Sequence, residues 1–121
     1  MNTNERFSKI NFNGHEIWVT DFSDLKAEDI VKLANEAANR IKNSGRDDLL
    51  VLDIVERVSI DNKVAPALKN FTKEAGPHMK KYAAVGVRGF ARVIASSINF
   101  LGLINLQVFD TIQEAKEYLV S

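Results

Sequence analysis

The chain has 121 residues, of which 45% are hydrophobic and 26% are charged, and its formal net charge is zero. This size and composition are typical of one folded domain over residues 1–121 and argue against disorder. There is no cysteine, which excludes disulfide bonds, thiolate catalysis and cysteine-ligated metals. No apolar run has the length of a secretory signal or a membrane span, so we expect a cytoplasmic protein without a transmembrane segment.

The first elements are predicted to form a β-hairpin. Residues 7–12 and 16–22 alternate between apolar and polar positions around Asn13-Gly14, the dipeptide most suited to a two-residue turn with positive φ. Ile17 and Val19 are expected on one face, and Trp18 on the other. A sheet that opens with such a hairpin is mixed and not purely parallel.

A helix, a buried strand and a second helix follow. Apolar residues recur at helical spacing over 27–42, and the run Leu49–Val55 predicts a strand that is covered on both faces. Residues 64–75 again have helical spacing, with Pro66 tolerated in the first turn.

The last third contains two strand-then-helix units with little between them. Strands are predicted at 81–87 and 104–109, and helices at 90–101 and 110–120. A capping box, Thr111 to Glu114, marks the start of the last helix. The whole pattern predicts an α/β domain with a mixed, mostly parallel five-stranded sheet and about four helices, in the order ββαβαβαβα.

Positive charge is concentrated between residues 63 and 92. Seven lysines and arginines lie there against one acidic residue, Glu74. This pattern has two interpretations: the solvated side of a helix and its loops, or a site for an anionic ligand, a lipid headgroup or an acidic partner. General nucleic-acid binding is not expected, because aromatic residues are not interleaved with the cations.

Asp53 is a carboxylate within an apolar strand. If it is buried, it must accept hydrogen bonds or change its pKa. The favoured interpretation is that it accepts backbone amides from a neighbouring loop, and the alternative is a functional role.

No metal site is expected. Each histidine, His15 and His78, stands beside a turn residue and at no ligand spacing from the other. Asp53 and Asp61 could hold magnesium together with Asp47 and Asp48, but the last two precede the strand at its opposite end.

The segment that begins at Arg88 carries two candidate sites. The turn before the predicted helix at 90–101 combines Arg88 and Gly89 with backbone amides, which is a pattern for binding an anion or simply a tight turn. The helix itself is apolar around most of its circumference, which favours contact with a partner, a ligand or a membrane surface. The candidate interface residues are Ile94, Ile98, Phe100 and Leu101.

The order of elements over roughly residues 5–120 resembles the STAS domain, in particular its SpoIIAA-like branch. The resemblance is most specific in KKYAAVGVRGFARVIASSINFLG and in VFDTIQEAKEYLV. In typical STAS proteins, a strand that ends in Asp leads to an Asp-Ser-Ser-Gly turn whose serine is phosphorylated. Asp61 matches the Asp of that turn, but Asn62, Lys63 and Val64 replace the rest, which implies that the phospho-switch is lost.

The branch is related in fold to lipid-transfer domains of the CRAL-TRIO type, which implies a hydrophobic ligand as a possibility. No triad, Walker-type loop or dinucleotide glycine motif is present in the sequence, so neither an enzyme nor a cofactor is expected.

The sequence therefore leaves two binding functions open. The first hypothesis is a non-catalytic regulatory module that self-associates or docks a protein partner through the helix at 90–101. The second is binding of a lipid, another amphiphile or a small anion by a protein in peripheral contact with membranes, with Arg88 and Lys63 near the headgroup. The candidate ligand-binding residues are Asp53, Asp61, Asn62, Lys63, Arg88, Gly89, Phe90 and Arg92.

Overall fold

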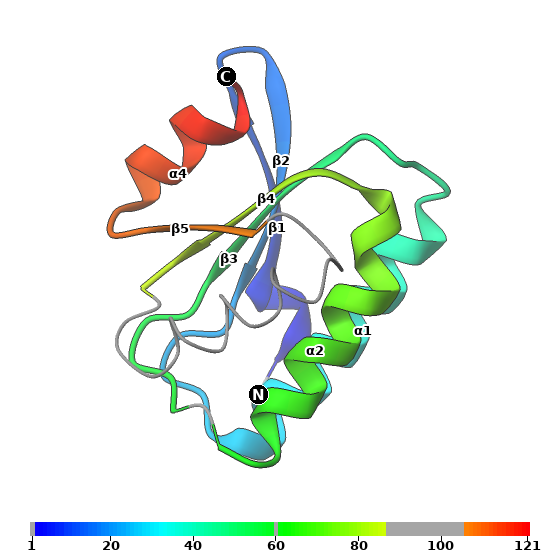
Figure 1. Ribbon diagram of the computed structural model, residues 1–121, viewed down its shortest axis with the longest axis vertical. Helices are drawn as coiled ribbons and strands as arrows, with labels where there is room; N and C mark the ends of the chain where they lie inside the picture. Colours follow the sequence, from blue (N-terminus) through cyan, green and yellow to red (C-terminus); the bar gives the residue numbers. More distant parts are fainter. Residues whose placement is uncertain (1, 60, 87–105) are drawn as a thin grey trace.

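The computed structural model describes residues 2–59, 61–86 and 106–121. They form a five-stranded sheet in the order β1-β2-β3-β4-β5, with β1 antiparallel to β2 and every other pair parallel (Figure 1). The expected mixed, mostly parallel sheet is therefore confirmed. The strands are β1 (Phe7–Phe12), β2 (His15–Asp21), β3 (Leu49–Ile54), β4 (Met79–Val85) and β5 (Leu106–Phe109).

Three α-helices lie within the described residues, namely α1 (Ala27–Asn43), α2 (Val64–Ala75) and α4 (Ile112–Leu119). Short 3-10 turns precede β1 at Thr3–Arg6 and β4 at Gly76–His78. The helix expected at 90–101 lies outside the described residues. None of the helices in the described part is long and apolar enough to cross a membrane.

The β1–β2 hairpin turns as its sequence predicts. Asn13 and Gly14 have φ values of 51° and 82°, and Phe12 pairs with His15 across the turn. The amide of Gly14 also donates to Asn11 Oδ1 at 3.2 Å. Asparagine and glycine tolerate this left-handed backbone better than other residues, which explains why the turn forms here.

The helices cover the two faces of the sheet unequally. α1 and α2 lie side by side on one face, whereas α4 packs on the other (Figure 1). The connections β2-α1-β3 and β3-α2-β4 step in the same direction along the sheet, and a common handedness places both helices on the same face.

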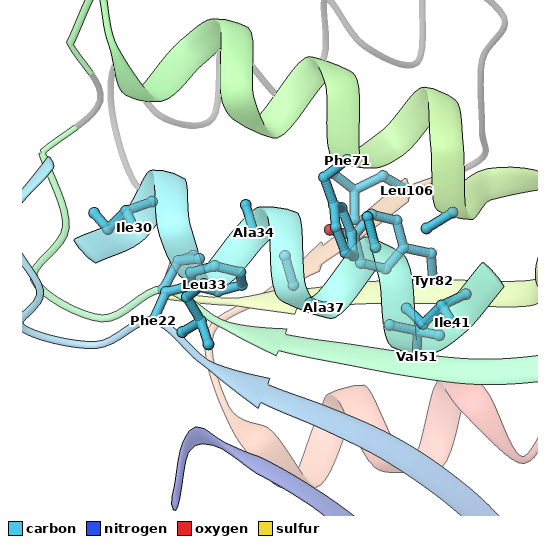
Figure 2. Close-up of a cluster of buried hydrophobic side chains, with 14 of the residues drawn as sticks. Phe22, Ile30, Leu33, Ala34, Ala37, Ile41, Val51, Phe71, Tyr82 and Leu106 are labelled. Carbon is cyan, nitrogen blue, oxygen red and sulfur yellow. The ribbon is translucent and has the colours of Figure 1, made fainter. Parts of the chain in front are cut away.

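The core beneath α1 and α2 is the larger of the two. Phe71 of α2 stacks at a tilt on Tyr82 of β4, with 6.0 Å between the ring centroids. Figure 2 shows both rings beside Leu106 of β5, while Ile41 of α1 lies near Val51 of β3. This face also holds Asp53, because residues 51, 53 and 55 of the chain alternate with the residues of the other face.

The core beneath α4 is smaller, and its buried residues are apolar throughout the described chain. Ala115 and Leu119 of α4 pack on β3 and β4 there. The same cluster includes Ile17 and Val19, so the predicted division of β2 between the two faces is confirmed.

Several element boundaries differ by one or two residues from the sequence-based expectation, and the differences in β4 and α4 have clear causes. β4 begins at Met79 and ends at Val85, two residues earlier than predicted at both ends, because Gly86 takes φ +90° and stops the strand. The α4 helix begins at Ile112, since Thr111 is its extended N-cap and accepts the Glu114 amide at 3.1 Å. The expected reciprocal bond to a backbone amide is not formed in the described structure, because the Thr111 hydroxyl donates to Glu114 Oε1 at 2.9 Å.

Gly86 also allows a close approach between two chain segments. A Cβ atom at this position would lie 2.7 Å from Glu56 Cδ and 3.1 Å from Glu56 Cα. Glycine is therefore needed where β4 leaves the sheet beside the loop that follows β3.

Candidate functional site

A cleft of about 570 Å³ opens between the hairpin and the C-terminal half of α1. Its volume lies in the range of small-molecule sites. The apolar part of the lining comes from β1, β2, β3 and α1. The lining residues are Phe7, Ser8, Lys9, Trp18, Val19, Thr20, Ala37, Arg40, Ile41, Asn43, Ser44 and Val51.

Two cations of the cleft are held over aromatic rings. Lys9 Nζ lies 4.3 Å from the ring centroid of Trp18, and Arg40 Cζ lies 4.1 Å from that of Phe7. Such contacts favour a cation by electrostatic attraction to the face of the ring. They also hold the two charges against the aromatic side chains of the lining.

Arg40 and Trp18 also form hydrogen bonds with residues outside the lining of the cleft. Arg40 Nη2 donates to the amide oxygen of Asn4 at 2.6 Å, and the indole N–H of Trp18 donates to Glu16 Oε1 at 2.8 Å. Glu16 is itself neutralised by Arg46, whose Nη1 lies 3.4 Å away. The lining contains two cations and, among the described residues, no carboxylate, so the cleft favours an anion.

Asp53 and Tyr82 form a second polar feature, buried in the core beside this cleft. The Tyr82 hydroxyl donates to Asp53 Oδ2, and only 2% of Asp53 is exposed. Within the described chain, Asp53 Oδ1 has no hydrogen-bond partner. Among the described residues, no loop amide donates to Asp53 as the sequence led us to expect, and a phenol from β4 reaches the carboxyl instead.

Burial shifts the ionisation of both groups. Desolvation raises the pKa of Asp53 to about 7, although the hydrogen bond from Tyr82 opposes this shift. Burial and the nearby Asp53 carboxyl raise the pKa of Tyr82 well above its ordinary value, so the phenol remains a donor.

Asp61 accepts hydrogen bonds from backbone amides at the start of α2. Its Oδ1 accepts the backbone amides of Lys63 and Val64, both at 2.9 Å, at the start of α2. These bonds lower the pKa of the Asp61 carboxyl. Asn62 and Lys63 are exposed beside it, and Lys63 Nζ lies 3.9 Å from Glu28 at the start of α1.

The structure does not bring Asp53 together with Asp61. The first is buried beneath the helices, whereas the second is exposed at the loop before α2. In the described ranges, no group of three or more histidines and acidic residues could hold a metal ion. The remaining predicted site residues lie outside the described residues, namely Arg88, Gly89, Phe90, Arg92, Ile94, Ile98, Phe100 and Leu101.

Two loops at the carboxyl end of the sheet are joined by an ion pair. Arg57 Nε and Nη2 lie 2.5 Å and 2.9 Å from the two carboxylate oxygens of Asp24. Both residues have positive φ, 62° for Asp24 and 55° for Arg57, and the pairing lowers the pKa of the Asp24 carboxyl. The pair connects the segments that follow β2 and β3.

Comparison with family models, with curated proteins and with solved structures gives no match to this chain. The resemblance to STAS domains therefore stays a prediction. The geometry of the cleft and of the buried carboxyl carries the functional argument.

Sequence reasoning missed the cleft and the role of Tyr82. Residues of a strand alternate between the two faces of the sheet, so the sequence of the fourth strand could have placed Tyr82 on a buried face. A buried phenol needs a hydrogen-bond partner. The cleft gave no such signal, because Phe7, Trp18 and Arg40 come together only when α1 packs beside the hairpin.

Proposed function

We propose that this domain is a non-catalytic binding module that takes a small anionic amphiphile into the cleft beside α1. The observation that carries the proposal is a pocket of about 570 Å³ with an aromatic and aliphatic lining, two cations and no carboxylate among its described lining residues. A ligand with one anionic group and an apolar body complements both properties.

The charge of the cleft is available to a ligand. In the described part of the chain, neither Lys9 nor Arg40 forms an ion pair, and each rests on an aromatic ring. A sulfonate or carboxylate that reaches them gains two charge-assisted contacts and displaces no internal carboxylate. The apolar body of the ligand would then contact Phe7 and Trp18, the half-buried aromatic residues of the lining.

This site differs from the one that the sequence suggested for an amphiphile. Lys63 lies near Glu28 in the first turn of α1, whereas Arg40 lies in the last turn of that helix. Arg40 follows Glu28 by twelve positions in the helix, which corresponds to a distance of about 18 Å along its axis. The proposal therefore keeps the ligand class of the second hypothesis and moves the headgroup to the other end of α1.

The proposal does not depend on the segment that supported a protein-interaction module. That hypothesis rests on residues 88–101, which lie outside the described residues. On the surface that the structure describes, Ile112 is the exposed large hydrophobic residue, at 42% exposure. A single exposed residue does not make a docking patch.

Fluorescence of Trp18, the single tryptophan of the chain, provides a direct test. We would titrate the protein with decanesulfonate, decanol and decyltrimethylammonium, each kept below the concentration at which it aggregates. All three carry the same alkyl chain, so differences in affinity report the headgroup alone. We expect decanesulfonate to bind most tightly and the cationic ligand to bind least.

Charge substitutions locate the site. Arg40→Gln and Lys9→Gln should each weaken decanesulfonate binding by about fivefold to tenfold, the usual loss for one charged contact. Lys32→Gln is the matched control, because Lys32 is an exposed cation of α1 that does not line the cleft. Equal affinities for the anionic and cationic ligands, or equal losses in all three variants, would contradict the proposal.

A further inference from the structure

The buried carboxyl of Asp53 is not used by the proposed binding function, although it lies directly behind the cleft. Asp53 is the register partner of Thr20 in the neighbouring strand β2. It also follows Val51 by two residues in β3, so Val51 and Asp53 point to the same face. Thr20 and Val51 both line the cleft.

The distance between these positions is short. Neighbouring strands of a sheet lie about 4.8 Å apart, which is therefore the approximate spacing between the backbones of Asp53 and Thr20. An ionised Asp53 would place a negative charge one strand away from the floor of an anion-binding cleft. Asp53 and Thr20 are both buried, and charges in such surroundings are poorly screened.

We propose that Asp53 regulates this cleft through its proton: the site binds its anionic ligand when Asp53 is neutral and loses affinity when Asp53 is ionised. The inference rests on the proposed function, because it concerns the regulation of the same site.

The surroundings of Asp53 do not neutralise its charge. Its register partners are Thr20 on β2 and Ala84 on β4, neither of which is ionisable. The residues that α1 and α2 bury over this face are apolar apart from Thr72, whose hydroxyl donates to Leu68 O at 3.0 Å. In the described structure, Tyr82 is the one titratable group that faces Asp53.

The two oxygens of the carboxyl differ in a way that suits this role. Oδ2 receives the Tyr82 hydroxyl, whereas Oδ1 has no partner among the described residues. A buried carboxylate needs several donors to remain charged at low cost, and one phenol does not supply them. Since burial raises the pKa of Asp53 to about 7, the carboxyl changes its charge near neutral pH.

Thermodynamic linkage makes the effect reciprocal. If ionisation of Asp53 weakens anion binding tenfold, then a bound anion raises the pKa of Asp53 by about one unit.

The test measures the affinity for decanesulfonate at pH 5.5 and at pH 8.5 by Trp18 fluorescence. The sulfonate stays ionised at both values, so a pH dependence belongs to the protein. We expect wild-type affinity to fall by about fivefold to tenfold at the higher pH, because the ionised Asp53 repels the anionic ligand through poorly screened protein. Asp53→Asn, which is neutral at every pH, should bind at both values as the wild type does at pH 5.5.

A second measurement does not require the variant to fold. The carboxyl carbon of Asp53 can be titrated by NMR in the wild-type protein, with and without decanesulfonate. A ligand-induced increase of its pKa supports the inference. If Asp53 titrates but the affinity is constant with pH, or if Asp53→Asn keeps the pH dependence, the inference is wrong and the proposed function stands. If decanesulfonate binds at neither pH, both fail together.

Discussion

The two faces of the sheet differ in what they bury. Beneath α4, every buried residue of the described cluster is apolar, including Leu52, Val85 and Leu119. Beneath α1 and α2, the core contains a phenol and an ionisable carboxyl, Tyr82 and Asp53. The same face opens into the cleft between α1 and the hairpin.

This difference shows where the fold tolerates a thermodynamic cost. An apolar core stabilises a domain without further conditions, whereas a buried carboxyl with one partner destabilises its ionised form. A group that lowers stability at neutral pH and lies beside the cleft fits the proton-dependent binding that we propose for it. The α4 face, in contrast, is explained by packing alone.

Leu52 and Asp53 are adjacent in β3 and point to opposite faces, so the same substitution can be made on each. Leu52→Asn should lower the free energy of unfolding by about 3–5 kcal/mol, because it buries an amide and removes aliphatic contacts on the α4 face. Urea denaturation of the variant at pH 7 would measure the loss. A loss below about 1 kcal/mol would show that the two faces are not as different as their composition indicates.

Asp53→Asn should instead change the pH dependence of stability. The folded-state pKa of Asp53 is raised from 3.8 to about 7, so the folded protein holds a proton that the unfolded chain releases between these values. The stabilisation is complete below pH 4 and is lost as the pH rises to 7, with an upper limit of about 4 kcal/mol.

The measurement is urea denaturation of wild type and Asp53→Asn at intervals from pH 4 to pH 8. The free energy of unfolding of the variant should not show this decline. It should therefore increase relative to that of the wild type as the pH rises. Parallel curves for the two proteins would mean that the pKa of Asp53 is the same in the folded and unfolded states, which would contradict this expectation.

Tyr82→Phe should have a smaller effect on the same face. It removes the single described donor to Asp53 and leaves the ring packed on Phe71. We expect a loss of about 1–3 kcal/mol at pH 8 and a smaller loss at pH 5, where the carboxyl is neutral. Because the bond from Tyr82 lowers the pKa of Asp53, an NMR titration of the variant should give a higher value.

The sequence predicted the sheet better than it predicted the site. Alternation around Asn13-Gly14 and the apolar run in β3 placed the hairpin and a buried strand correctly, because both signals are local. The bond between Asp53 and Tyr82 joins residues 29 positions apart and depends on strand register, which local patterns do not contain. The cleft likewise requires β1 and α1 to meet, so its cations looked like ordinary surface residues.

Asp61→Ala should produce the smallest effect. The substitution removes two bonds to the first amides of α2 but leaves both faces of the sheet unchanged. We expect a modest decrease in the thermal midpoint at pH 7 and a smaller one at pH 3, because Asp61 has a lowered pKa and is needed in its ionised form. Calorimetry would measure both. A decrease as large as that of Leu52→Asn would show that the loop before α2 matters as much as the core.

The contact between Gly86 and Glu56 predicts how substitutions would be tolerated along the chain. A methyl group at position 86 would overlap the side chain of Glu56. The φ of +90° at this position would also strain any residue other than glycine. In a library that samples every replacement at every position, residue 86 should accept almost none, whereas exposed Gly14 and Gly45, with open space around them, should lose less from added bulk. A designer who wishes to alter this protein should leave that glycine alone.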